Sequence, residues 1–229
     1  MNIFLHKLNA HGKFDGLLTR VDSLFDKALE CIGEKLPLEE INIDVIISEG
    51  DFVIPEFGFC GYSPSSGQIM LFFDLNNENL DTCLDAEFMP SLGHEIHHCF
   101  RHKGVGYGKT LQEAVISEGL ACHFEVELRN GDVPFYAQAI NQDMIDVLHS
   151  KMLNEAANLT YDHNVWFFGT EPDSIPLHAG YTLGYCIVSN YIKATGTPAS
   201  QLWNVSANEF FDGTLLQAEN DHVLKGSSR

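Results

Sequence analysis

The chain has 229 residues and a formal net charge of −19, and 45% of its residues are hydrophobic and 11% aromatic. This length suits one substantial domain or two small ones, with enough apolar residues for a real core. The acidic balance excludes nucleic acid and anionic membranes as partners, because neither attracts a strongly negative surface.

The sequence has no signal of membrane insertion or secretion. No segment approaches the ~20 continuous apolar residues of a membrane span. The start, MNIFLHKLNAHGKF, has its apolar patch interrupted by His6 and Lys7, unlike a signal peptide. The six cysteines are scattered without paired CxxC spacing, which excludes a zinc ribbon and favours reduced thiols. We therefore expect a cytoplasmic protein.

The first third of the chain predicts a helix followed by strands. Apolar residues recur at helical spacing from Phe14 to Ile32. Three strand-like runs follow, and the last two flank the turn sequence SPSSG as in a hairpin: INIDVIIS at 41–48, FGFCGY at 57–62 and QIMLFF at 68–73. QIMLFF has two interpretations. It forms the sheet edge, where an extended substrate adds as a strand, or it is fully buried, as its unbroken apolar run indicates.

From about residue 87 onward the pattern is helical. Pro90 suits a first helical turn, Asp132 and Pro134 begin another helix, and a helix over 177–194 ends at Gly196. We expect an α+β, zincin-like fold, in which a small N-terminal β-sheet packs against a mainly helical C-terminal region. The predicted organisation is a single domain over 1–229, with the helix and sheet in 1–85, the helical part in 86–215 and a mobile tail at 216–229.

The stretch GHEIHHCF, residues 93–100, holds three histidines and a glutamate. Both His94 with His98 and His94 with His97 would share one face of a helix. At about 100° per residue, a metal between His94 and His98 has Glu95 about 80° to one side, whereas the other pairing leaves it about 130° away. Only the pairing of His94 with His98 places Glu95 close to the open coordination position of the metal. His94, Glu95 and His98 therefore match the His-Glu-x-x-His pattern of zinc peptidases, with Glu95 as the general base.

A catalytic zinc needs a third protein ligand, and the segment TLQEAVISEGLACHFEVEL at 110–128 supplies a candidate. Thr110 followed by Glu113 is a capping-box helix start. Glu118 lies in the middle of the apolar stripe that should face the core, where an unpaired carboxylate costs several kcal/mol. A metal ion would compensate it, and Gly119 would let another backbone come close.

Two alternatives to Glu118 as a metal ligand stay open. Glu118 forms a salt bridge to an arginine or lysine, or Glu125, two turns on along nearly the same face, is the ligand instead. The neighbours of Glu125, Glu127 and Arg129, suggest that the helix emerges into solvent at that point.

These residues carry a resemblance to a known family. HEIHH followed by Glu118 within SEGLA resembles the glutamate-zincin (gluzincin) arrangement. The wider string GHEIHHCFR…TLQEAVISEGLACHFE, with WFFG and GYTLGY, is similar from about residue 85 to 195 to a family of predicted zinc-dependent proteases. The resemblance implies one zinc ion held by His94, His98 and Glu118. Many gluzincins carry an aspartate four residues after the glutamate ligand, but here that position is Cys122, so another residue must orient the ligating histidine.

A helix over 177–194 would place His178, Tyr181 and Tyr185 within about 60° of one another. A phenol facing the zinc could donate a hydrogen bond to the developing oxyanion, and Tyr181 is the candidate because the resemblance is strongest in GYxxGY. The alternative is ordinary packing of half-buried tyrosines. No role is assigned to a further set of basic residues, which surface or supporting positions explain equally well: His97, Arg101, His102 and His123.

The functional hypothesis is zinc-dependent hydrolysis of a peptide bond in a peptide or protein substrate. His94, His98 and Glu118 would hold the metal, and Glu95 would take a proton from the attacking water and pass it to the leaving amine. Two alternatives stay open: a zinc-binding regulatory protein that cleaves nothing, and a zinc hydrolase acting on a non-peptide amide.

Overall fold

The computed structural model describes residues 2–170 and 174–211. The contacts divide the chain into two compact units. The first consists of 1–104 with 124–132, and the second of 105–123 with 133–229, as far as these are described. The predicted tail at 216–229 lies outside the described residues, and the single domain stays a prediction.

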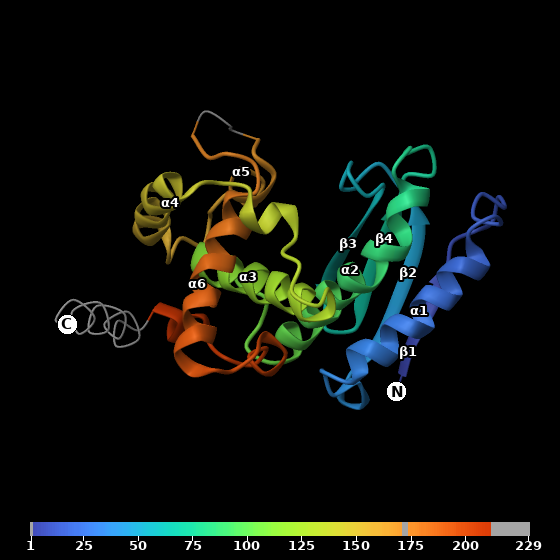
Figure 1. The fold of residues 1–229 in the computed structure, drawn as a ribbon, viewed down its shortest axis with the longest axis horizontal. Coiled ribbons are helices and arrows are strands. Elements are labelled where there is room, and N and C mark those ends of the chain that lie inside the picture. Colours follow the sequence, from blue (N-terminus) through green and yellow to red (C-terminus); the bar gives the residue numbers. More distant parts are fainter. Residues whose placement is uncertain (1, 171–173, 212–229) are drawn as a thin grey trace, which may run out of the picture. The chain divides into compact units, whose positions relative to one another are not determined.

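A four-stranded sheet with the order β1-β2-β4-β3 forms the base of the first unit (Figure 1). The strands are β1 (Asn2–Lys7), β2 (Asn42–Glu49), β3 (Phe59–Ser65) and β4 (Gln68–Phe73). β1 and β4 pair with β2 in parallel, whereas β3 pairs with β4 in antiparallel fashion. The α+β prediction is confirmed. β1 was missed, because a short strand of mixed apolar and polar residues has no distinctive pattern.

The position predicted for QIMLFF at the sheet edge is wrong. β4 lies between β2 and β3, and the edge beside it is β3. β4 is not buried on both faces either, since Ile69, Leu71 and Phe73 are buried while the residues between them are half-buried. Side chains alternate across a strand, so the buried set faces the helices that cover this sheet.

Two helices cover the buried face of the sheet. α1 (Leu18–Gly33) packs against α2 (Leu80–Lys103), and α2 packs against β3 and β4. α1 matches the predicted helix except for its first turn. Pro90 was wrongly predicted to lie in a first turn, because α2 begins ten residues earlier and holds Pro90 in its buried interior. A proline by itself favours the start of a helix. Here the burial of Leu80, Leu84 and Phe88 stabilises the helical turns that precede Pro90.

Helices make up the second unit. α3 (Leu111–Leu128) supplies residues to both units, and the predicted capping box at its start is confirmed. Glu113 Oε2 accepts from the Thr110 amide at 3.0 Å, and the Glu113 amide donates to Thr110 Oγ1 at 3.3 Å. The remaining elements are η2 (Phe135–Gln138), α4 (Gln142–Glu155), α5 (His163–Phe168), α6 (Ala179–Thr195), η3 (Ala199–Gln201) and η4 (Ala207–Phe211); a short turn η1 (Leu38–Glu40) lies in the first unit.

Asp132 and Pro134 precede only the short 3-10 turn η2, and the longer helix α4 begins after Asn141, whose side chain accepts from the Met144 amide at 3.0 Å. α6 ends at Gly196, as predicted, but begins at Ala179, two residues later than predicted; Gly196 has the left-handed conformation. Within the described residues, no helix is both long and apolar enough to cross a membrane.

The close backbone approach predicted for Gly119 is confirmed. A Cβ atom at Gly119 would lie 2.3 Å from the carbonyl of Gly184, so α3 and α6 touch through two glycines. Beside this crossing lies a core cluster of the second unit, and its members come from α3, α4, α5 and α6 and the loop before α6: Leu111, Ala114, Val115, Leu148, Met152, Trp166, Phe167, Ile175, Ala179 and Leu183.

Candidate metal centre

The second half of α2 buries polar residues that a helix normally exposes. His94 is 8% exposed, Glu95 7% and His98 4%. Charged or hydrogen-bonding groups at this depth each cost several kcal/mol unless they have partners. The partners of these side chains therefore indicate what the buried residues do.

The rings of His94 and His98 lie together, as the four-residue spacing predicts. Their centroids are 4.6 Å apart and their planes are almost perpendicular at 83°. His97 turns to another side, where it is fully buried and packs against the Phe124 ring at 5.6 Å. The geometry thus favours His94 with His98 as the metal-facing pair.

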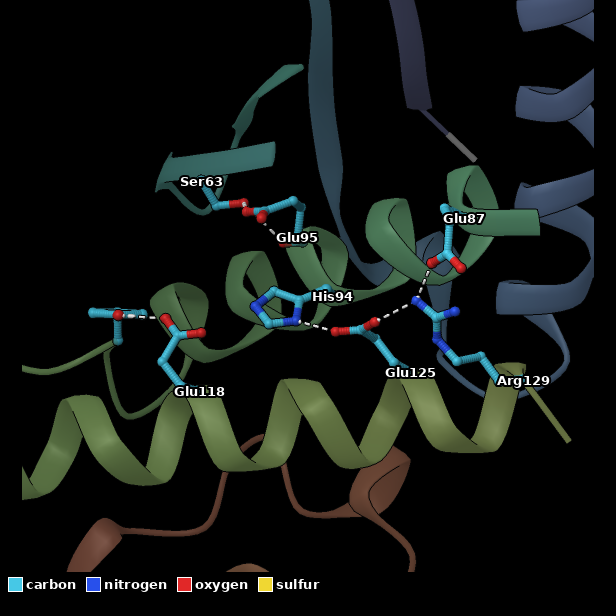
Figure 2. Close-up of polar contacts among 8 residues, drawn as sticks. Ser63, Glu87, His94, Glu95, Glu118, Glu125 and Arg129 are labelled. Carbon is cyan, nitrogen blue, oxygen red and sulfur yellow. Dashed lines mark hydrogen bonds and ion pairs between the residues drawn. The ribbon is translucent and has the colours of Figure 1, made fainter. Parts of the chain in front are cut away.

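Glu95 is held by the edge strand β3. The Ser63 hydroxyl donates to Glu95 Oε2 at 2.7 Å and lies 2.9 Å from the Glu95 main-chain oxygen (Figure 2). The strand reaches the glutamate because position 61 is glycine: a Cβ atom there would lie 2.3 Å from Glu95 Cγ. Gly61 and Ser63 therefore fix the carboxylate predicted to act as general base. Sequence analysis missed both, because nothing local relates a strand residue to a helix thirty positions away.

Glu118 is buried on α3, as the apolar stripe around it predicts, and is 5% exposed. The hydroxyl of Tyr107, in the loop before α3, donates to Glu118 Oε1 at 2.5 Å. Burial and the charge of Glu118 raise the pKa of Tyr107 well above its usual value, so the phenol stays a donor. Tyr107 was also missed; the only local signal was a tyrosine between two glycines, eleven residues before the glutamate.

Two sets of three possible ligands have their ligand atoms within 4.8 Å of one another in the described part of the chain. One is His94, His98 and Glu118; the other is His94, Cys122 and Glu125. In the second set His94 Nδ1 and Glu125 Oε1 are already 2.7 Å apart, the distance of a direct hydrogen bond. The first set, two imidazoles and one carboxylate, is a donor set that suits a catalytic zinc.

The expectation that α3 emerges into solvent near Glu125 is wrong. Glu125 is fully buried, and Arg129 and Glu87 are nearly so, with side chains 12% and 16% exposed. Arg129 donates to Glu125 Oε2 at 3.0 Å and to Glu87 (Figure 2). The three residues form an ionic cluster shielded from solvent, which explains why charged residues near the end of the helix do not mark a solvent-exposed face.

Tyr181 is half-buried on α6 and packs among other aromatic rings. Its centroid lies 5.3 Å from that of Tyr136, 5.1 Å from Phe167 and 6.0 Å from His178. It lies near enough to Tyr107 to contribute to the raised pKa of that phenol. These ring contacts are those expected if Tyr181 is an ordinary half-buried packing residue. A catalytic role of Tyr181 stays a prediction.

The other basic residues given no role are buried or half-buried rather than exposed. Arg101 is buried, and His102 Nε2 lies 3.1 Å from the Ser63 carbonyl oxygen. His123 stacks on Tyr185 with centroids 4.0 Å apart. Burial lowers the pKa of His123 to about 4, so this imidazole is neutral at pH 7.

Comparison with known families agrees with this arrangement. The family model described as "Predicted Zn-dependent protease (DUF2268)" matches residues 21–212. The chain belongs to this family. No curated protein and no solved structure gives a match. The predicted family is confirmed, and its description accords with the donor set of two histidines and a glutamate in the structure.

Proposed function

We propose that the protein is a zinc peptidase of gluzincin type, in which His94, His98 and Glu118 hold one zinc ion. The observation that carries the proposal is the meeting of these three ligand atoms within 4.8 Å in a chain of a zinc-dependent protease family. When bound, zinc supplies Lewis acidity, which lowers the pKa of water toward about 7 and polarises a carbonyl.

Glu95 is the general base of the proposed reaction. It follows directly after His94 in the chain, and the donor from Ser63 holds its carboxylate at one oxygen, Oε2. Glu95 takes a proton from the attacking water at the carboxylate and passes it to the leaving amine as the carbon–nitrogen bond breaks. Burial excludes bulk water from this proton transfer.

The ligand Glu118 needs its charge to bind a cation. The hydroxyl of Tyr107 donates to one of its oxygens, which stabilises the charged form and fixes the orientation of the carboxylate. The proposed substrate is a peptide or protein, bound so that the scissile carbonyl reaches both the metal and Glu95.

The test is the variant Glu95→Gln, assayed with a peptide library and by metal analysis. The variant should retain zinc and lose at least about 100-fold in turnover, the usual contribution of a general base. Glu78→Gln is the control, since it makes the same change at an exposed position just before α2. Full activity of Glu95→Gln would refute the role of Glu95. A zinc-loaded wild type that cleaves no peptide but hydrolyses small amides would refute the peptide substrate.

A further inference from the structure

Glu125 is a fully buried carboxylate on α3 whose contacts aim it at a histidine. Its Oε1 lies 2.7 Å from His94 Nδ1 (Figure 2). A carboxylate with no exposed surface is not there for solubility, and its burial must be compensated by specific partners. His94 is one of these partners.

Arg129 holds the other oxygen of this carboxylate. It donates to Glu125 Oε2 at 3.0 Å and also to Glu87, so one guanidinium is shared by two carboxylates. Burial acts to lower the pKa of Arg129, but the hydrogen bond to Glu87 and the charges of Glu125 and Glu87 outweigh it and raise that pKa. The guanidinium therefore stays charged, and the Glu125 carboxylate is held between Arg129 on one oxygen and His94 on the other.

We propose that Glu125 is the positioning residue of the metal centre: it accepts the Nδ1 proton of His94, fixes the ring and leaves Nε2 for the metal. This inference rests on the proposed function. A histidine whose second nitrogen donates to a carboxylate is a stronger and better-oriented metal ligand. Glu125 thus sets how tightly the site holds zinc, although it does not touch the metal.

The helix geometry explains why a glutamate at position 125 can reach His94. Seven residues after Glu118 is about 700° of rotation, within about 20° of two full turns, so Glu118 and Glu125 share one face of α3. Cys122, four residues after Glu118, has no carboxylate to offer. Glu125, three residues further along the same helix, does have one, and it lies 2.7 Å from His94 Nδ1.

The test measures the zinc dissociation constant by competition with a chelator, without any assay of activity. Glu125→Gln keeps the volume of the side chain and removes its charge, and Glu125→Ala removes the contact. We expect zinc binding to weaken about 10- to 100-fold, the usual effect of losing an orienting partner. The alanine variant should show the larger loss of affinity. Circular dichroism and thermal unfolding of the metal-free variants check that they fold.

Two matched variants separate positioning from structural support. Glu127→Gln makes the same change on the same helix about 200° around from Glu125, and zinc affinity should be unchanged. Glu87→Gln removes the other carboxylate from Arg129 but leaves the His94 contact, so its loss of affinity should be smaller than that of Glu125→Gln. The d–d absorption spectrum of the cobalt-substituted protein should change in Glu125→Gln and not in Glu127→Gln.

The outcomes are distinguishable from failure of the proposed function. If the wild-type protein binds no zinc, the proposed function itself fails. If the wild type binds zinc tightly and Glu125→Gln binds it equally well, only the role of Glu125 is refuted. Equal losses in Glu87→Gln and Glu125→Gln, with unchanged cobalt spectra, would reduce Glu125 to a structural residue and also overturn the inference.

Discussion

In the first half of α2, residues 80–89, buried apolar side chains are interspersed with exposed ones, whereas every residue of 92–101 is buried. Charged residues occur in both halves. Asp81 and Asp85 in the first half have side chains 87% and 66% exposed and pair with Arg20 from α1. Glu95 in the second half is buried and held by Ser63 from the edge strand.

The difference shows where on this helix the proposed function is expected to lie. Breaking an exposed ion pair costs the protein little stability, because water replaces the lost partner. Apolar residues of similar size often stabilise a core as well as buried polar groups do, so a cluster of buried polar residues is a candidate for a functional site. The second half of α2 buries three histidines, Glu95 and Arg101, and the following predictions test this contrast.

The largest effect on zinc binding is expected for His98→Ala. Loss of a direct ligand should weaken zinc binding more than about 100-fold, because loss of an orienting partner alone costs about 10- to 100-fold. Chelator competition measures it. His11→Ala, at an exposed position before α1, is the control and should bind zinc like the wild type. Equal affinity of the two variants would remove His98 from the metal centre.

The next effect is a loss of turnover without loss of zinc, expected for Gly61→Ala. The new Cβ atom would lie 2.3 Å from Glu95 Cγ, so the proposed general base must move. We expect a fall in kcat of about 100-fold or more, with zinc content unchanged. Gly67→Ala, in the turn of the same hairpin, meets its nearest atom at an ordinary 3.5 Å and should keep full activity. A fully active Gly61→Ala variant would show that β3 does not position Glu95.

A smaller effect is expected for Ser63→Ala, which removes the donor to Glu95 but leaves the space around it. One buried hydrogen bond to a charged group contributes about 1.5–3 kcal/mol, so kcat should fall by roughly 10- to 100-fold while KM changes little. Ser63→Thr keeps a hydroxyl and should recover part of the rate. If the alanine and threonine variants were equally slow, bulk rather than the hydrogen bond would be responsible.

The smallest effect is expected in the first half of α2. Arg20→Met breaks the exposed pairs with Asp81 and Asp85, and the thermal midpoint should fall by less than about 2 °C. The hydrogen bond from Arg20 lowers the pKa of Asp85, so the contribution of this pair is present at neutral pH and is lost as the pH falls through the folded-state pKa of Asp85. Calorimetry at neutral and acidic pH checks both points. A large fall of the thermal midpoint of Arg20→Met at neutral pH would contradict the contrast between the two halves of α2.

The sequence predicted the parts of the structure that depend on local spacing. The four-residue spacing of His94 and His98 and the capping box of Thr110 and Glu113 are properties of a single helix, and both are present. The burial of Glu118 followed from the apolar residues around it on the same helix. The order of the strands did not follow, because an apolar run is compatible with either a central or an edge position.

Contacts between distant segments account for what was missed. Ser63 and Gly61 reach Glu95 only because β3 lies at the sheet edge against α2. Glu125 looked exposed because its charged neighbours in the sequence resembled a surface, whereas Arg129, which it shares with Glu87, pairs with it in the interior. No local pattern distinguishes these two cases.

The most direct test of the account is anomalous diffraction at the zinc edge from crystals of the zinc-loaded protein. The account predicts one zinc peak within about 2.0–2.2 Å of a ring nitrogen of His94, a ring nitrogen of His98 and a carboxylate oxygen of Glu118. A peak beside Cys122 and Glu125 without Glu118, or the absence of any peak at His94, would contradict it.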